Sequence, residues 1–270
     1  MDVIVNRSGD GRPIPPQKPS WVLKEISKAF PGVQALDCVS MEIFPGEVHA
    51  LIGENGSGKS TLAKCLAGVH QPESGEVFFQ NKPIVFHNPM EAKIAGVATI
   101  YQEFSLVAIL TVAENIFLGR YPHNSSGMID WKAVHEGTRQ VLEQLSLDID
   151  SRAVVKELSV AKQQLVEIAK AISMESSLLI MDEPTASLDP NISQLIRQKI
   201  KEYVEKTKTA TLWTSHNMQE IEAVCDQVLF LSHGRILLSG NPKTLPSEYG
   251  KKDLEELFIT VAREPLFFGS

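Results

Sequence analysis

A glycine-rich segment at 53–61 has the residue types and spacing of a loop that binds phosphate groups. It fits the pattern G-x-x-x-x-G-K-[S/T] and follows a continuous apolar run over 48–52. Glycines let the backbone turn around an anion with its N–H groups pointing inward, and a helix that begins there adds the positive end of its dipole. The residues assigned to this loop are Gly53, Glu54, Asn55, Gly56, Ser57, Gly58, Lys59, Ser60 and Thr61.

Two side chains of the loop can neutralise phosphate charge and bind a metal ion. We expect Lys59 to neutralise the β- and γ-phosphates of a nucleotide, and the Ser60 hydroxyl to hold Mg²⁺. The alternative is a glycine-rich turn between a strand and a helix that binds no ligand. The apolar run before the loop and the helical pattern after it favour the phosphate-binding interpretation.

Acidic and histidine side chains follow two further apolar runs. The run at 178–181 ends in Asp182 and Glu183, and the run at 211–214 is followed by Ser215 and His216. An acidic strand end is often merely solvated, and a lone histidine is often structural. Beside a phosphate-binding loop, however, one carboxylate can reach Mg²⁺ and another can orient the attacking water. We assign Asp182 to the metal, Glu183 to the water and His216 to the γ-phosphate.

These motifs need a scaffold that brings strand ends together. Nearly continuous apolar runs, several followed by helical periodicity, are typical of parallel strands covered on both faces. Alternation over 39–43 before a Pro-Gly turn, with short runs at 76–79 and 84–86, instead predicts a half-buried antiparallel sheet. The predicted parallel strands are 48–52, 97–101, 178–181 and 211–214.

The remaining patterns divide the chain into units. Apolar residues at helical spacing predict helices after Gly58 and after Leu158, and the mainly helical stretch between the strands predicts an inserted lobe over about 103–160. The proline-rich first residues bury little and are expected to form a mobile tail. The predicted units are the tail (1–20), a main domain (21–240) and a C-terminal helical extension (241–270) with an amphipathic helix at 252–261.

Composition excludes several other classes. The formal net charge is -7 and the basic residues are scattered, whereas nucleic-acid-binding surfaces need clustered Lys and Arg, so no nucleic-acid partner is expected. No apolar run approaches the roughly 20 residues that cross a bilayer, and residues 1–20 lack an apolar signal segment. We therefore expect a cytoplasmic chain. Cys38, Cys65 and Cys225 lack metal-ligand spacing and are expected to be small buried hydrophobic residues.

Together and in this order, the motifs resemble those of the ATP-binding-cassette (ABC) ATPases over about 21–240. The resemblance implies an α/β, P-loop NTPase (RecA-like) core with an antiparallel β subdomain and an inserted α-helical subdomain, which hydrolyses ATP with Mg²⁺. It implies that Phe30 stacks on adenine and that Gln102 reaches the metal and moves with the helical lobe. Ser187-Leu188-Asp189 matches a loop that communicates across a dimer of cassettes through Asp189.

The stretch that matches the family signature departs from it. The signature is usually Leu-Ser-Gly-Gly-Gln, and this chain has Leu158-Ser159-Val160-Ala161-Lys162. In the family this segment completes the ATP site of the opposite subunit, which assigns Ser159 to nucleotide binding. Val160 and Ala161 constrain close backbone approach to a phosphate. Ser159 can still cap the helix, while Lys162 cannot complete a capping box and its charge opposes the helix dipole.

The sequence is similar to the carbohydrate-importer branch at 32–36, 114–119 and 157–171. This resemblance implies an ATPase subunit peripheral on the inner face of the cell membrane, which works as a homo- or heterodimer of cassettes with a transmembrane permease and, for import, a solute-binding protein. Members of that branch typically fuse two cassettes and this sequence has one, while 253–258 resembles the tail of some exporter-type cassettes. The alternatives are a lipid or drug exporter subunit, a soluble cassette ATPase of DNA repair or the ribosome, and a non-hydrolysing regulatory module.

Overall fold

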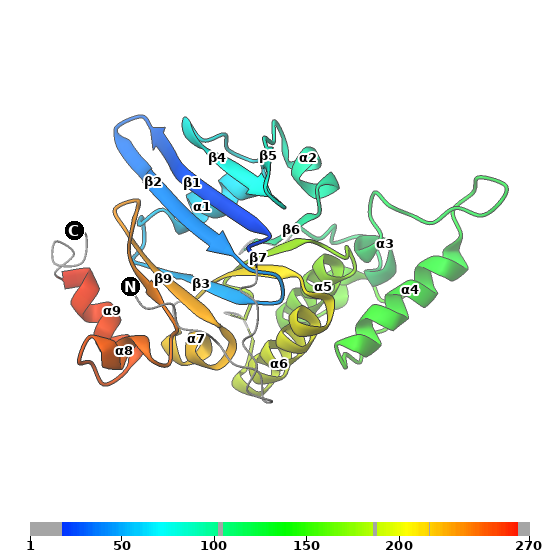
Figure 1. Cartoon of the computed structure of the whole chain (residues 1–270). Coiled ribbons are helices and arrows are strands. Elements are labelled where there is room, and N and C mark those ends of the chain that lie inside the picture. Colours follow the sequence, from blue (N-terminus) through cyan, green and yellow to red (C-terminus); the bar gives the residue numbers. More distant parts are fainter. Residues whose placement is uncertain (1–17, 102–104, 186–187, 216, 264–270) are drawn as a thin grey trace, which may run out of the picture.

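The larger of the two β-sheets in the described residues contains the strands that the predicted loop and carboxylates follow (Figure 1). The computed structural model describes residues 18–101, 105–185, 188–215 and 217–263. The large sheet has six strands in the order β10-β9-β3-β8-β7-β6, all parallel except β10, which is antiparallel to β9. The predicted parallel strands are therefore confirmed. The strands are β3 (Val48–Ile52), β6 (Val97–Ile100), β7 (Leu178–Asp182), β8 (Ala210–Thr214), β9 (Gln227–Ser232) and β10 (Arg235–Gly240).

The smaller sheet is antiparallel, as predicted, with strand order β2-β1-β4-β5. Its strands are β1 (Trp21–Phe30), β2 (Val33–Ile43), β4 (Ser74–Phe79) and β5 (Lys82–Ile84). The prediction of a strand at 84–86 was wrong by two residues. Gln80 and Asn81 both adopt left-handed backbone conformations, with φ of 49° and 62°, so a tight turn pairs Phe79 directly with Lys82.

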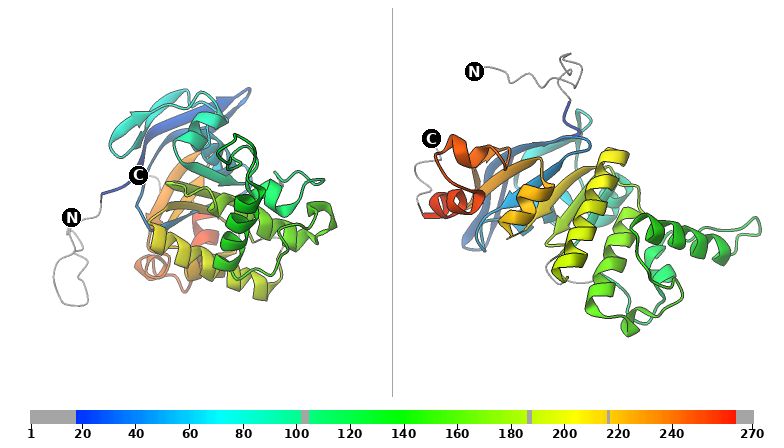
Figure 2. Two further views of the ribbon diagram at one scale, coloured as in Figure 1. Left: turned by 90° about the vertical axis from the view of Figure 1, so that its right-hand side faces the viewer. Right: turned by 90° about the horizontal axis from the view of Figure 1, so that it is seen from below.

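Helices surround the large sheet. Helices α3, α4 and α5 pack against one another, and α4 extends away from the sheets (Figure 2). The helices are α1 (Lys59–Leu66), α2 (Pro89–Ile94), α3 (Val112–Ile116), α4 (Trp131–Gln144), α5 (Val160–Ile172), α6 (Pro190–Thr207), α7 (Met218–Val224), α8 (Leu245–Glu248) and α9 (Leu254–Arg263), with a short 3₁₀ turn, η1 (Val155–Glu157). None of these helices combines the length and hydrophobicity that a membrane span requires.

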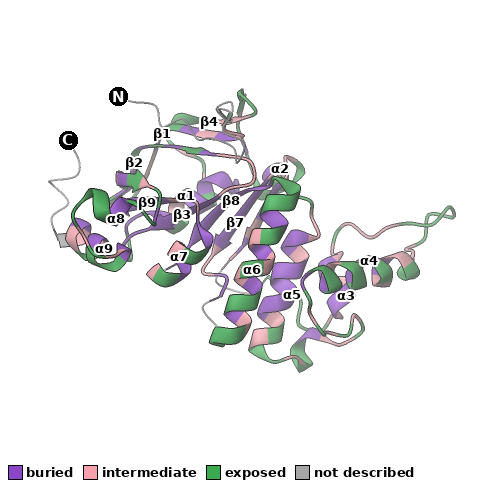
Figure 3. Cartoon of the chain, turned by 60° about the horizontal axis from the view of Figure 1, so that its bottom comes forward, coloured by how far each residue is buried: buried purple, intermediate pink, exposed green. Residues whose placement is uncertain are grey.

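The large sheet has a hydrophobic core on each face. Along β7, Leu179 and Met181 join a core with α5, α6 and α9, whereas Leu178 and Ile180 join a second core with α1 and the smaller sheet. Figure 3 shows β3, β7 and β8 as largely buried. Burial on both faces explains why these strands are continuous apolar runs rather than alternating ones.

The three cysteines do not share one environment. Cys65 and Cys225 are buried, as predicted, but Cys38 is exposed, so the prediction was wrong for that residue. The pairing of β1 with β2 is irregular around Cys38, because its register shifts between Ile26↔Val39 and Lys28↔Leu36. Cys38 itself has a φ of 51°. The simple alternation of the strand therefore fails at this position.

We expect the Cys38 thiol alone to react rapidly with Ellman's reagent in the native protein at about pH 8. Burial raises the pKa of Cys65 to about 11 and also raises the pKa of Cys225, so both stay protonated as well as inaccessible. All three thiols should react in denaturant. Cys38→Ser should abolish the rapid native phase, and a rapid phase that survives this substitution would contradict the assignment.

Candidate functional site

The predicted phosphate-binding loop joins β3 to α1 and lies at the edge of the sheet where β7 ends. A cavity of about 440 Å³ opens between the loop and the end of β7. The fold thus brings together the loop and both predicted carboxylates. The lining residues are Ala35, Asn55, Gly56, Gly58, Lys59, Ser60, Thr61, Asp182 and Glu183.

Close backbone packing shapes the loop. Gly58 is the N-cap of α1 with a φ of 111°, and a Cβ there would overlap the carbonyl oxygen of Ala35. A Cβ on Gly53 would overlap the carbonyl oxygen of Leu231. A loop held this tightly presents backbone and the N-terminus of α1 to the cavity, which is an arrangement that suits an anion.

Lys59 lines the cavity and is 8% exposed. Its Nζ donates hydrogen bonds to the carbonyl oxygens of Gly53 at 2.7 Å and Glu54 at 3.0 Å. Burial lowers the pKa of Lys59, while the negative charges of Glu183 and Asp182 act in the opposite direction. The amine is therefore fixed in place beside two carboxylates, in a position to meet a phosphate.

The Asp182 carboxylate is held by hydroxyl groups from two other elements. Ser60 Oγ, in α1, donates to Asp182 Oδ2 at 3.4 Å, and Thr214 Oγ1, at the end of β8, donates to Asp182 Oδ1. Hydroxyl and carboxylate oxygens are suitable ligands for Mg²⁺. In the described ranges no group of three His, Cys, Asp or Glu could hold a metal. The Ser60 hydroxyl and the Asp182 carboxylate thus fit an ion that takes the rest of its shell from phosphate oxygens and water.

Glu183 lines the same cavity from the first position after β7. Its backbone is left-handed, with a φ of 51°, and its N–H donates to the carbonyl oxygen of Thr214 at 3.1 Å. Non-glycine residues held in this sparsely populated region tend to occur at functional sites. The left-handed backbone at Glu183 turns the chain out of the sheet directly after Asp182, so the two carboxylates follow one another at the end of β7.

Several predicted site residues lie outside the cavity of this chain. Gly53 and Glu54 contribute carbonyl oxygens to Lys59, and Ser57 is buried beside them; none of the three lines the cavity. Phe30, at the end of β1, is 37% exposed, and its ring packs in an edge-on arrangement with the His70 ring at a centroid distance of 5.2 Å.

Gln102, Ser187 and His216 fall outside the described residues, as do residues 1–17 of the predicted tail.

Ser159 and Asp189 both cap helices. Ser159 Oγ accepts a long hydrogen bond, 3.4 Å, from the backbone N–H of Lys162 at the start of α5. Asp189 Oδ1 accepts from the N–H groups of Asn191 at 3.0 Å and Ile192 at 3.1 Å at the start of α6. Neither residue lines the cavity of its own chain. The predicted Ser159 cap is thus present, and it is a weak one.

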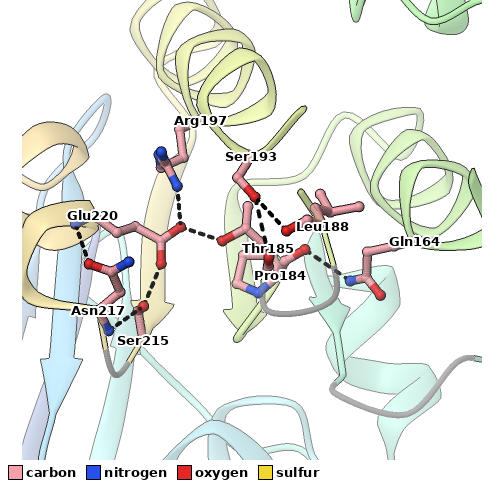
Figure 4. A network of polar contacts seen from close by, with 9 residues as sticks. All are labelled: Gln164, Pro184, Thr185, Leu188, Ser193, Arg197, Ser215, Asn217 and Glu220. Atoms are coloured by element: carbon pink, nitrogen blue, oxygen red, sulfur yellow. Dashed lines mark hydrogen bonds and ion pairs between the residues drawn. The ribbon is translucent and has the colours of Figure 1, made fainter. Parts of the chain in front are cut away.

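Polar residues that sequence reasoning missed surround the loops after β7 and β8 (Figure 4). They centre on Glu220, which is 5% exposed. Glu220 is in the first turn of α7, where an acidic residue usually marks a solvated helix start. Thr214 was also missed, since its bond to Asp182 depends on the register between β7 and β8. The residues of this network are Gln164, Pro184, Thr185, Leu188, Ser193, Arg197, Ser215, Asn217 and Glu220.

Comparison with known proteins gives consistent matches. The family model described as ABC transporter matches residues 36–186. The chain is 44% identical over 247 residues to ribose import ATP-binding protein RbsA 2 of Streptomyces avermitilis, covering 89% of this chain and 48% of that protein. It is 46% identical over 222 residues to ribose import ATP-binding protein RbsA 1 of Streptomyces coelicolor, covering 82% and 44%. The chain spans about half the length of the curated relatives it matches.

Solved structures show the same fold. A nucleotide-free ATP-binding cassette from an ABC transporter aligns with a TM-score of 0.76 at 26% identity, covering 90% of this chain and 98% of that one. The cbiO1 protein of Clostridium perfringens, part of the ABC transporter complex cbiONQ, aligns with a TM-score of 0.75 at 26% identity, covering 94% and 98%. These likenesses confirm the predicted P-loop NTPase fold class.

We expect Gly58→Ala to destabilise the chain more than Gly56→Ala. Both glycines have positive φ, 111° and 82°, but nothing lies within 4 Å of a Cβ on Gly56. Gly56→Ala should therefore lower the free energy of unfolding by about 1 kcal/mol through backbone strain alone. Gly58→Ala adds the overlap with Ala35 and should lower it by about 3 kcal/mol. Urea unfolding measures both values, and equal losses would refute the role given to this close approach.

Proposed function

Because the chain belongs to the ABC transporter family, we propose that it is a cassette that binds and hydrolyses ATP to power the import of a sugar. The observation that carries the ATP chemistry is the cavity where the N-terminus of α1, Lys59, Asp182 and Glu183 meet. The names of the similar ribose import proteins support the sugar as solute. The resemblance of 32–36, 114–119 and 157–171 to carbohydrate importers points the same way.

The loop residues would bind the triphosphate. Backbone N–H groups of 53–61 and the α1 dipole attract the phosphate oxygens, and the Lys59 ammonium neutralises the β- and γ-phosphates. The half-exposed Phe30 ring stacks on adenine. Ser159 and Asp189 act on the site of a second cassette, which is in keeping with their position as helix caps away from the cavity of their own chain.

The two carboxylates divide the work at the γ-phosphate. Asp182, fixed by Ser60 and Thr214, would reach Mg²⁺ through water, and the Ser60 hydroxyl and Gln102 would hold the ion. The ion, when bound, neutralises charge on the phosphate oxygens. Glu183, one residue further and in the same cavity, orients the attacking water and accepts its proton, and His216 contacts the γ-phosphate.

A transporter needs further subunits. We infer a transmembrane permease, a second identical or different cassette, and a solute-binding protein, with the chain peripheral on the inner face of the membrane and no nucleic-acid partner. The part of the helical lobe around 103–118 receives a helix from the permease. Reconstitution with that permease tests direction, because a lipid or drug exporter would use the same ATP chemistry; outward transport would contradict the import function.

We expect Lys59→Ala to weaken ATP binding. The loss of a charge-assisted contact with the phosphates should raise the Kd for Mg-ATP by about 10- to 100-fold. Lys64→Ala is the matched control, because Lys64 is an exposed lysine on the same helix. Calorimetric titration of both variants gives the comparison. An unchanged Kd for Lys59→Ala would remove the lysine from the site.

Glu183→Gln should bind Mg-ATP with nearly unchanged affinity. Its phosphate release should be slower by at least about 100-fold, because an amide cannot accept the proton of water. Glu175→Gln is the control, since Glu175 is exposed and shares the left-handed backbone, with a φ of 48°. Phosphate release and ATP titration are measured together. Wild-type turnover by Glu183→Gln would exclude its role, and an inactive wild type would support the non-hydrolysing module.

A further inference from the structure

The Glu220 carboxylate joins the two loops that leave β7 and β8 (Figure 4). It accepts hydrogen bonds from Thr185 Oγ1 and Ser215 Oγ, and Arg197 Nη1 lies 3.4 Å from its Oε1. Thr185 and Ser215 both belong to those loops, while Arg197 is on α6. One side chain on α7 therefore holds two loops that are 30 residues apart in the sequence.

The two loops carry the groups proposed to act on the γ-phosphate. Thr185 is two residues after Glu183, and Ser215 directly precedes His216 in the sequence. The start of the first loop is also held by backbone bonding, since the N–H of Glu183 donates to the carbonyl oxygen of Thr214. Glu220 adds a second connection through Thr185, on the other side of Glu183. Glu183 therefore lies between two attached points, its own backbone N–H and the Thr185 hydroxyl.

Further contacts anchor the same loops to neighbouring helices. Ser193 Oγ, on α6, donates to the carbonyl oxygens of Thr185 at 3.4 Å and Leu188 at 3.3 Å. Gln164 Nε2, on α5, donates to the carbonyl oxygen of Pro184 at 3.1 Å. The chain after Glu183 is thus attached to α5, α6 and α7. Glu220 provides the side-chain link that also reaches the loop after β8.

The chemistry of a carboxylate suits this position. Burying a carboxylate is unfavourable unless it is paired, so a hydrophobic residue would be the more favourable choice for a purely structural role. A carboxylate only accepts hydrogen bonds, so both hydroxyls must donate to it. The Ser215 oxygen then accepts the N–H of Asn217 at 3.1 Å. Each hydroxyl has a defined direction, which fixes the loops relative to each other.

We propose that Glu220 is a positioning residue for ATP hydrolysis, which sets the loop of Glu183 against the loop after β8. This inference rests on the proposed hydrolysis of ATP. Loss of the carboxylate lets the two loops move independently, so Glu183 no longer holds water in line with the γ-phosphate. The phosphate-binding loop is on a different element, and nucleotide binding stays intact.

The first experiment compares Glu220→Ala with Glu222→Ala in the 270-residue chain. Glu222 is on the same helix and accepts a hydrogen bond from the N–H of Leu254 at 3.2 Å, away from the site. Glu220→Ala should lower kcat for phosphate release by about 100-fold and leave the Kd for Mg-ATP within about threefold. Glu222→Ala should leave both unchanged. A folded Glu220→Ala with wild-type kcat would overturn the proposal.

A second pair of variants decides the matter if Glu220→Ala does not fold. Thr185→Val removes the hydroxyl with little change in shape and should lower kcat by about 10-fold, and Thr185→Ser should restore it. A purely structural role predicts no such split between kcat and Kd. Equal kcat for Thr185→Val and wild type would overturn the proposal. If the wild-type chain binds Mg-ATP but releases no phosphate, the proposed hydrolysis fails instead, and the role of Glu220 in it falls with it.

Discussion

The parallel register of β3, β8 and β7 is the constraint on which the site depends. Leu51 and Asp182 both pair with Thr214, so the ends of three strands lie at one level. The predicted phosphate-binding loop follows β3 there, and Asp182 and Glu183 lie at the end of β7. A shift of one residue in either pairing would turn the side chains of a strand to the opposite core and separate Ser60 from Asp182. The two hydrophobic cores that hold the register thereby hold the site.

Electrostatics at this edge is balanced by groups from separate elements. The buried Lys59 amine lies beside Asp182 and Glu183, and the buried Glu220 carboxylate is near Arg197. Each of these charges would be expensive to bury alone, and each has a partner of opposite sign from a different strand or helix. The charged groups therefore favour the same arrangement of elements that hydrophobic burial favours. Agreement between the two forces is what allows polar side chains to be fixed within an otherwise apolar sheet.

The sequence was most informative where a motif is local. The loop at 53–61 and the carboxylates after 178–181 could be predicted because a glycine pattern or a strand end defines them within a few residues. The burial of Glu220 could not, since it arises only when loops after two strands meet α7. The exposure of Cys38 was missed for a similar reason, because the register shift between β1 and β2 leaves no mark in the alternation.

The start of α5 departs from the family signature, and its stability comes from packing in the core rather than from its cap. Ser159 caps α5 weakly, and the Lys162 charge opposes the helix dipole, so the first turn contributes little by itself. The helix nevertheless begins at Val160, because Leu165 and Ile168 are buried in the core and packing stabilises most protein helices. Val160 is 57% exposed in that turn. The substitutions therefore leave the helix in place and change the surface that its first turn presents to another molecule.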